Sequence, residues 1–190
     1  MDKIRAFLAA PISEDVRSYL EKIISEMKGE THDWKWVNPK NLHITLKFLG
    51  YCDNKQILDI QRTISKCIKN IQPFSYVLSG LGAFPNERSA RVLWAGIKDE
   101  EKNFNKIYKL LERNLAKRGF EKERRDYSPH ITIARSKKRQ NINNLFLELN
   151  LEKFGNLPVQ LNDRITLYKS VLSPQGPSYY KLKEFIFQNK

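Results

Sequence analysis

His43-Ile44-Thr45-Leu46 and His130-Ile131-Thr132-Ile133 repeat one pattern, in which a histidine and a threonine alternate with apolar residues. Alternation of this kind is typical of a β-strand, where every second side chain points to the same face. Each motif therefore predicts a strand that presents one imidazole beside one hydroxyl. The chain has 3 histidines, and two of them lie in this pattern. The repetition predicts one shared site to which two parts of the chain each contribute a strand.

Strands and helices alternate on both sides of the two motifs. Period-two runs predict strands at 4–10, 42–49, 74–84, 91–97, 130–135, 159–172 and 179–187. Apolar residues at helical spacing predict helices that begin after Ser13, near Asp53 and near Phe104, with a short helix at 142–151.

The order of elements after residue 97 broadly repeats the order before it. The expected fold is therefore α+β, with two similar lobes whose antiparallel sheets face a central cleft and whose helices lie on the outside. A chain of 190 residues suits one such unit, so we expect a single two-lobed domain over 1–190.

The charge of the chain favours a polyanionic partner, and nucleic acid is the first candidate. The formal net charge is +13 and the isoelectric point is near 9.7. Residues 98–139 hold 14 Lys or Arg against 7 Asp or Glu, a net of 14 − 7 = +7. Because Arg124-Arg125 and Lys137-Lys138-Arg139 flank the second motif, we expect these clusters to contact RNA.

Cysteine content and hydropathy predict a soluble protein of a reducing cytoplasm. Cys52 and Cys67 are too few for a disulfide framework. The apolar run 6–12 is broken by Pro11 and followed by acidic residues, so a buried strand is expected there and not a signal peptide. No run is long enough to span a membrane. Nothing in the sequence indicates an obligate protein partner, and a monomer is expected.

Two imidazoles in one cleft can carry out acid–base chemistry at phosphorus. An imidazole titrates near neutral pH, so one histidine can accept a proton while the other donates one. The hydroxyls of Thr45 and Thr132 can bind phosphate oxygens, and the guanidinium of Arg135 can neutralise the charge that builds there. Strict alternation would point Arg135 away from His130, so this role requires a bulge near Ala134.

Other catalytic schemes find less support in the sequence. The two cysteines have no metal-ligand spacing, and a Gly-rich phosphate loop of the nucleotide-binding type is absent. No serine lies in a nucleophile-elbow sequence. The sequence therefore predicts catalysis by side chains alone, with no metal and no cofactor.

Four aromatic residues could stack on a base at the cleft, namely Trp36, Phe48, Trp94 and Tyr127. Phe48 and Trp94 lie in strongly apolar strands, which favours core packing for both. None of the four is therefore predicted to be a site residue.

Four runs resemble a known family. NLHITLKFLG at 41–50, AFP at 83–85, RVLWAG at 91–96 and SPHITIAR at 128–135 resemble the RNA 2′,3′-cyclic phosphodiesterases, also called 2′-5′ RNA ligases. These enzymes belong to the two-histidine phosphoesterase superfamily. The resemblance covers essentially the whole chain, and the two histidines are 130 − 43 = 87 positions apart.

The resemblance implies a specific reaction and specific roles. Members of the family hydrolyse a terminal 2′,3′-cyclic phosphate of RNA to a 2′-phosphate, and some join tRNA halves through a 2′-5′ linkage. Carried over by motif, His43 would be the proton donor and His130 the proton acceptor. Thr45, Thr132 and Arg135 would bind the phosphate.

Two other functions remain open at this level. The chain could be a non-catalytic RNA-binding module in which both histidines contact phosphate. It could also be a cyclic phosphodiesterase that acts on a small nucleotide or a 2′-5′ oligonucleotide. The charge of +13 favours RNA over a small substrate, since a small substrate does not require it.

Overall fold

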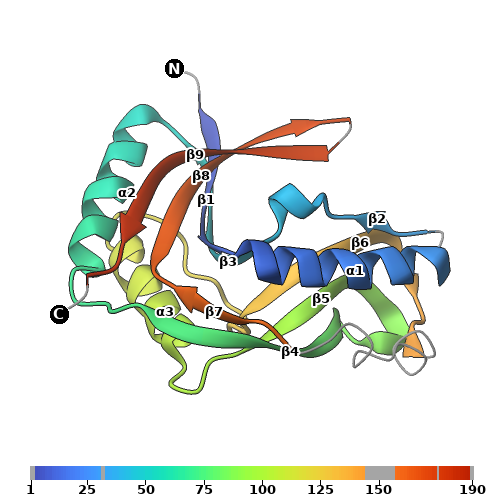
Figure 1. The fold of residues 1–190 in the computed structure, drawn as a ribbon. Helices are drawn as coiled ribbons and strands as arrows, with labels where there is room; N and C mark the ends of the chain where they lie inside the picture. The colour runs from blue at the N-terminus through green and yellow to red at the C-terminus, as the bar shows by residue number, and fades with distance from the viewer. Residues whose placement is uncertain (1–2, 31–32, 144–156, 175, 189–190) are drawn as a thin grey trace.

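One curved antiparallel sheet forms the framework of the protein (Figure 1). The computed structural model describes residues 3–30, 33–143, 157–174 and 176–188. Eight strands are hydrogen-bonded in the order β7-β4-β5-β6-β3-β1-β8-β9, and β2 pairs with β6 off this path. The elements are β1 (Ile4–Pro11), α1 (Glu14–Glu30), β2 (Lys35–Trp36), η1 (Pro39–Asn41), β3 (His43–Cys52), α2 (Asn54–Cys67), β4 (Phe74–Phe84), η2 (Glu87–Ser89), β5 (Ala90–Lys98), α3 (Asn103–Ala116), β6 (His130–Gln140), β7 (Val159–Asn162), β8 (Arg164–Ser173) and β9 (Gly176–Ile186).

The strand order is symmetric about its centre, where β6 lies next to β3. On one side β3 is followed by β1, β8 and β9, and on the other side β6 is followed by β5, β4 and β7. The inner pair of each half is joined in the same way, because α1 connects β1 to β3 and α3 connects β5 to β6. The predicted α+β fold with two similar lobes is confirmed, and each lobe supplies one motif strand.

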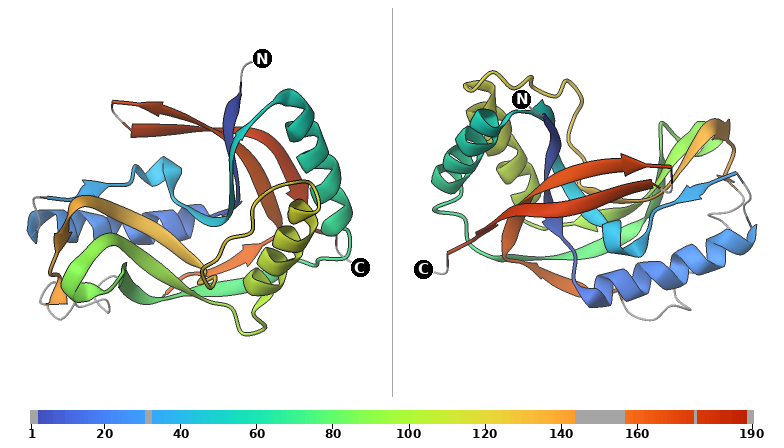
Figure 2. Two further views of the ribbon diagram at one scale, coloured as in Figure 1. Left: turned by 180° about the vertical axis from the view of Figure 1, so that it is seen from behind. Right: turned by 90° about the horizontal axis from the view of Figure 1, so that it is seen from above.

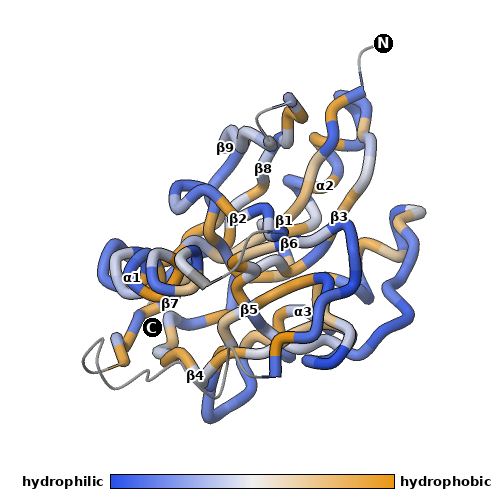
Figure 3. Tube along the Cα trace, turned by 90° about the vertical axis from the view of Figure 1, so that its right-hand side faces the viewer, coloured by the Kyte–Doolittle hydropathy of each residue, from blue (hydrophilic) through white to orange (hydrophobic). Residues whose placement is uncertain are grey.

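The helices lie on the outside of this sheet, as predicted. Figures 1 and 2 show α1 on one flank of the molecule and α2 beside α3 on the other. Hydrophobic residues recur along the strands, whereas the connecting loops are mainly hydrophilic (Figure 3). Leu8, Leu20, Ile44 and Phe104 are among the fully buried side chains between the layers. Within the described part of the chain, no helix has both the length and the apolar character needed to cross a membrane.

The start of α1 matches the predicted cap and also ties two distant segments together. Ser13 accepts a hydrogen bond at Oγ from the N–H of Val16 at 3.2 Å, which satisfies one of the free donors of the first helical turn. The side-chain amide of Gln160 on β7 accepts from the Ser13 N–H and donates to the Pro11 carbonyl at 3.0 Å. The turn between β1 and α1 is thus held against the opposite lobe.

The predicted continuous strand at 159–172 is wrong, because the chain breaks it at Asp163. β7 pairs with β4 in one lobe, whereas β8 pairs with β1 and β9 in the other. The chain changes lobe between these two strands, and the Asp163 carboxylate is held there by two bonds from Arg164, at 2.8 and 2.9 Å. The predicted helix at 142–151 lies almost entirely outside the described residues, which end at 143 on this side.

A buried ion pair connects β3 to the loop that precedes β6. Lys47 of β3 binds Glu112 of α3, and their side chains are only 5% and 9% exposed. The Lys47 ammonium also donates to the Glu121 carbonyl at 2.8 Å, and Glu112 accepts the N–H of Glu123 at 3.0 Å. Because charges this deeply buried must be paired, the two side chains fix the loop 117–128 against the first motif strand.

We expect Lys47→Met to lower the free energy of unfolding by about 3–5 kcal/mol, because it leaves the Glu112 carboxylate buried without its cation. Urea denaturation followed by circular dichroism measures the change. The double variant Lys47→Met/Glu112→Leu removes both charges and should recover much of the loss. A single variant as stable as the unmodified protein would contradict the assignment of this pair as buried and obligatory.

Candidate active site

One pair of residues joins the two motif strands. Ile44 of β3 pairs with Ile131 of β6 in antiparallel register. In this register His43 lies opposite Thr132 and Thr45 lies opposite His130, with all four side chains on the face away from the two buried isoleucines. The two histidines therefore occupy one diagonal of a square and the two threonines occupy the other. This is the shared site that the repeated motif predicts.

The two imidazoles are oriented by matching bonds to the backbone. His43 donates from Nδ1 to the Asn41 carbonyl at 2.6 Å, and His130 donates from Nδ1 to the Ser128 carbonyl at 2.7 Å. In each ring the proton on Nδ1 leaves Nε2 as the acceptor when the imidazole is neutral. At the first motif the Thr45 hydroxyl lies 3.0 Å from Nε2 of His43. Both rings can therefore exchange a proton through Nε2.

A β-bulge follows each threonine and reverses the faces to which the next side chains point. Trp94 pairs with Thr132 but its neighbour Leu93 pairs with Ala134, so Ile133 is an extra residue in β6. The Ile133 carbonyl is satisfied by the N–H of Val37 at 2.9 Å. The bulge makes Ile133 and Ala134 both buried and returns Arg135 to the face of His130. The bulge that the role of Arg135 requires is present.

The first motif has the same bulge, but a different type of residue follows it. Ala9 pairs with Thr45 and Leu8 with Lys47, so Leu46 is the extra residue in β3. Positions 43–48 and 130–135 consequently share one burial pattern, and Phe48 occupies the position that corresponds to Arg135. The prediction that Phe48 packs in the core is wrong, since its side chain is 60% exposed. A strict period of two does not predict this exposure, because the residue inserted by the bulge is not visible in the sequence.

Aromatic rings flank both histidines. Phe7 and Tyr179 lie beside His43, with ring centroids at 5.0 and 5.3 Å. Phe84 lies 5.0 Å and Trp94 6.2 Å from His130. Phe7, Tyr179 and Phe84 are not recognisable as neighbours of the histidines from the sequence, because only the strand pairing brings them to the motifs.

The prediction that Trp94 packs in the core is wrong, since its side chain is only partly buried and lies beside His130. Its indole lies over Gly82, where an added Cβ would come within 2.2 Å of the ring. Gly96, which pairs with His130, leaves room beside the same indole. The Trp94 ring nitrogen is buried without a protein partner among the described residues. The two glycines thus leave room for a large ring over β4 and β5, beside His130.

Burial and positive charge both disfavour a protonated histidine in the free protein. Burial lowers the pKa of His43 to about 4, with Arg135 and His130 adding to the effect and the bond to Asn41 opposing it. Burial also lowers the pKa of His130, and Arg135 adds to it. Burial raises the pKa of Tyr179, and Arg135 opposes that change. Arg135 therefore acts on all three groups, which places its charge among them.

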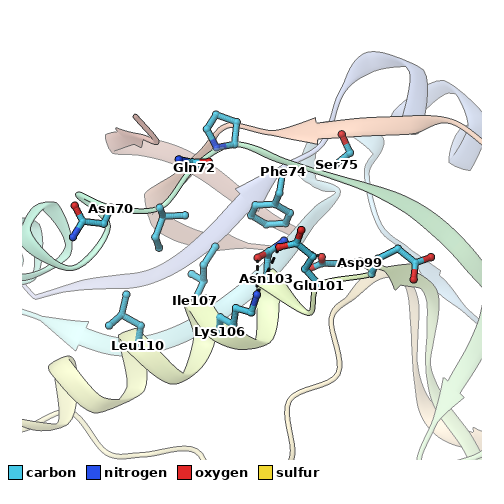
Figure 4. A pocket seen from close by; sticks show the side chains of 13 residues that line it. Asn70, Gln72, Phe74, Ser75, Asp99, Glu101, Asn103, Lys106, Ile107 and Leu110 are labelled. Carbon is cyan, nitrogen blue, oxygen red and sulfur yellow. Dashed lines mark hydrogen bonds and ion pairs between the residues drawn. The ribbon is translucent and has the colours of Figure 1, made fainter. Parts of the chain in front are cut away.

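An acidic hollow elsewhere on the protein is unrelated to the motifs. A cavity of about 500 Å³ lies beside the N-terminal end of α3, and Figure 4 shows Asp99 and Glu101 at its edge. Asp99 accepts the N–H of Phe104 at 2.8 Å and an amide hydrogen of Asn103 at 3.2 Å. Its carboxylate thus serves to cap the helix. In the described ranges, no three His, Cys, Asp or Glu side chains cluster as metal ligands would.

We expect the His43 ring of the free protein to titrate near pH 4 and the His130 ring below 6.5, as followed by NMR of the imidazole protons. Arg135→Gln should raise both values, because it removes a positive charge that opposes protonation. Lys66→Gln on the outside of α2 is a matched control that should change neither. A His43 pKa at or above 6.5 would contradict this description of the site.

Comparison with known proteins assigns the chain to a family. The family model described as AKAP7 2′5′ RNA ligase-like domain matches residues 7–181. The chain is 36% identical over 185 residues to the RNA 2′,3′-cyclic phosphodiesterase of Methanocaldococcus jannaschii, covering 96% of this chain and 100% of that protein. It is 34% identical over 186 residues to the enzyme of the same name from Methanothermobacter thermautotrophicus, covering 96% and 98%.

Solved structures have the same fold. The crystal structure of TT0787 of Thermus thermophilus matches with a TM-score of 0.78 and 26% identity, over 97% of this chain and 98% of that chain. Escherichia coli LigT complexed with 3′-AMP matches in fold with a TM-score of 0.77 and 22% identity, over 99% and 100%. The pairing of two His-x-Thr strands thus occurs in a fold of known type, and the chain belongs to the 2′-5′ RNA ligase-like family of two-histidine phosphoesterases.

Proposed function

We propose that the protein hydrolyses the terminal 2′,3′-cyclic phosphate of RNA to a 2′-phosphate, using His43 and His130 as an acid–base pair. The observation that carries this proposal is the single pairing of Ile44 with Ile131, which sets two Nε2 atoms and two hydroxyls around one point. The names of the two archaeal relatives support the substrate. Residues 1–190 act in this proposal as one two-lobed phosphoesterase domain.

The reaction breaks the bond from phosphorus to the 3′ oxygen. His130 accepts a proton at Nε2 from a water molecule as the water oxygen bonds to phosphorus. His43 donates a proton from Nε2 to the departing 3′ oxygen on the opposite side. The 2′ oxygen keeps its bond to phosphorus, so the product is a 2′-phosphate beside a 3′-hydroxyl. The diagonal placement of the two rings suits this in-line geometry.

The remaining site residues bind the phosphate. Thr45 and Thr132 donate hydroxyl hydrogens to its non-bridging oxygens. The guanidinium of Arg135 stabilises the negative charge that grows on those oxygens as water adds. Burial lowers the pKa of both histidines and Arg135 adds to this effect, so the charge of Arg135 lies near both rings.

The low pKa of His43 sets a condition on its role as donor. A histidine with a pKa near 4 is neutral at pH 7 in the free protein. The anionic phosphate favours the charged imidazole and so raises the pKa when it binds. His43 therefore acquires its catalytic proton together with the substrate.

The same site could also catalyse the joining of two RNA strands. If a 5′-hydroxyl of RNA replaces water, His130 takes its proton and the product contains a 2′-5′ linkage. The resemblance of the motifs to the ligase family suggests tRNA halves as the strands to be joined. We place this reaction second to hydrolysis, because water always competes for the same position.

A small cyclic nucleotide is the second candidate substrate. The observation in its favour is that all five predicted site residues lie close to the single Ile44–Ile131 pairing, on two adjacent strands. None of these five residues requires a substrate that is longer than one nucleotide. The length of the natural substrate then depends on the basic surface outside the site.

We expect RNA that ends in a 2′,3′-cyclic phosphate to be converted to a 2′-phosphate in the presence of EDTA. His43→Ala and His130→Ala should each lower kcat by at least about 100-fold, because each removes a general acid or base. Lys66→Ala is the control and should leave turnover unchanged. RNA that binds without conversion in the unmodified protein would instead favour the non-catalytic RNA-binding module.

The pH dependence follows from the lowered pKa values. The active form of the free enzyme carries one proton on the pair of histidines, and pairs with one proton are most abundant between the two pKa values. Because one pKa is about 4 and the other is below 6.5, kcat/KM should be highest on the acid side of pH 6.5. The maximum of kcat should lie at higher pH, since bound phosphate raises both values. A maximum of kcat/KM above pH 7.5 would rule out this explanation.

A further inference from the structure

A basic groove lies next to the site and is not used by the reaction. It has a volume of about 510 Å³ and lies between α3 and the loop 122–127. Two basic side chains come from the helix and three from the loop: Lys109, Arg113, Lys122, Arg124 and Arg125. The stacked rings of Tyr108 and Tyr127 form part of its wall, with centroids 4.3 Å apart and planes inclined by 6°.

The basic charges of the groove are largely free. Of its three acidic residues, Glu112 is buried in the ion pair with Lys47 and so does not offset the groove. Five basic and two acidic side chains remain, a net of 5 − 2 = +3. Glu123 already accepts the N–H groups of Arg124 and Arg125, at 2.9 and 3.4 Å. No salt bridge among the described residues involves the side chain of either arginine.

The groove is held in shape before any ligand arrives. The Glu121 carbonyl is fixed by Lys47 and the Glu123 N–H by Glu112, as described for the fold. At the other end of the loop, Asn105 of α3 donates to the Tyr127 carbonyl at 3.1 Å. A ligand therefore does not have to order the loop, which lowers the entropy cost of binding.

The groove adjoins both motifs through one residue. The Tyr127 hydroxyl donates to the Thr45 carbonyl at 3.1 Å, and burial raises the pKa of this phenol, so it remains a donor. The next residue, Ser128, holds the ring of His130. Tyr127 and Ser128 thus connect the loop that lines the groove to the first and the second motif.

We propose that this groove binds the phosphate backbone of the RNA strand on the 5′ side of the nucleotide held at the histidines. This inference rests on the proposed function, because it assigns the remainder of the same substrate. Lys and Arg bind phosphates by releasing condensed counterions, and the tyrosine wall offers a surface on which a base can stack. The groove is a better candidate than the basic cluster 137–139, which lies at the opposite end of β6 on exposed strand positions.

The test compares two charge-reversal variants that make the same change of net charge at two different places. Arg124→Glu/Arg125→Glu alters the groove, and Lys137→Glu/Lys138→Glu makes the same change of charge at the other end of β6. The substrates are a 2′,3′-cyclic nucleoside monophosphate and an RNA of about ten nucleotides with a cyclic phosphate end, each assayed over a range of salt concentrations.

The groove variant should raise the KM for the RNA by about tenfold and leave kcat and KM for the mononucleotide within about twofold. The dependence of log KM on log salt should become shallower by about 1.4, since two phosphate contacts at about 0.7 each are lost. The variant at the opposite end of β6 should retain the RNA KM of the unmodified protein.

Three results would overturn the groove assignment. Equal losses in both variants would indicate a general charge effect, and a loss only in the second variant would place the strand at the other end of β6. Reduced turnover of the mononucleotide by the groove variant would indicate a change in the site itself. The proposed function fails separately, if the unmodified protein converts neither substrate.

Discussion

A single antiparallel contact between Ile44 and Ile131 carries the chemistry of this protein. Around it, β3 and β6 diverge into separate lobes, so the ladder itself supplies little to hold the two histidines in place. The additional contacts come from the loop before β6, where Tyr127 reaches the Thr45 carbonyl and Lys47 reaches the Glu121 carbonyl. The buried pair of Lys47 with Glu112 thus supports the pairing of the two motif strands, although neither side chain lies on the face of the histidines.

The sequence was sufficient to predict the two motif strands, the alternation of elements and the meeting of the two motifs. It was sufficient because a period of two is a strong local signal and because the motif occurs twice. It failed where the outcome depends on a partner strand. The split at Asp163 follows from β7 and β8 pairing in different lobes, and the exposure of Phe48 follows from an extra residue that is visible only against β1. The contacts of Phe7, Tyr179 and Phe84 with the histidines were not predicted for the same reason, since these rings reach the histidines by long-range strand pairing.

The two halves of the site are alike in geometry and unlike in chemistry. Both motifs have a histidine held through Nδ1, a threonine and a bulge, followed by a residue that faces the cleft. That residue is an arginine at one motif and an exposed phenylalanine at the other. The scaffold is thus symmetric, whereas the residue after the bulge is charged at one motif and apolar at the other. Burial lowers the pKa of both imidazoles, and the one arginine adds to this effect at each of them.

The path of the last strands has a consequence for how the protein is made. β1, near the start of the chain, has β3 on one edge and β8 on the other, and β9, which carries Tyr179 to the side of His43, pairs only with β8. When both motifs have been synthesised, β9 and the ring that it places beside the first histidine have therefore not yet been synthesised. During synthesis one edge of β1 stays unpaired until β8 is made, near the end of the chain. The lobe that contains β1 is therefore begun first and completed last.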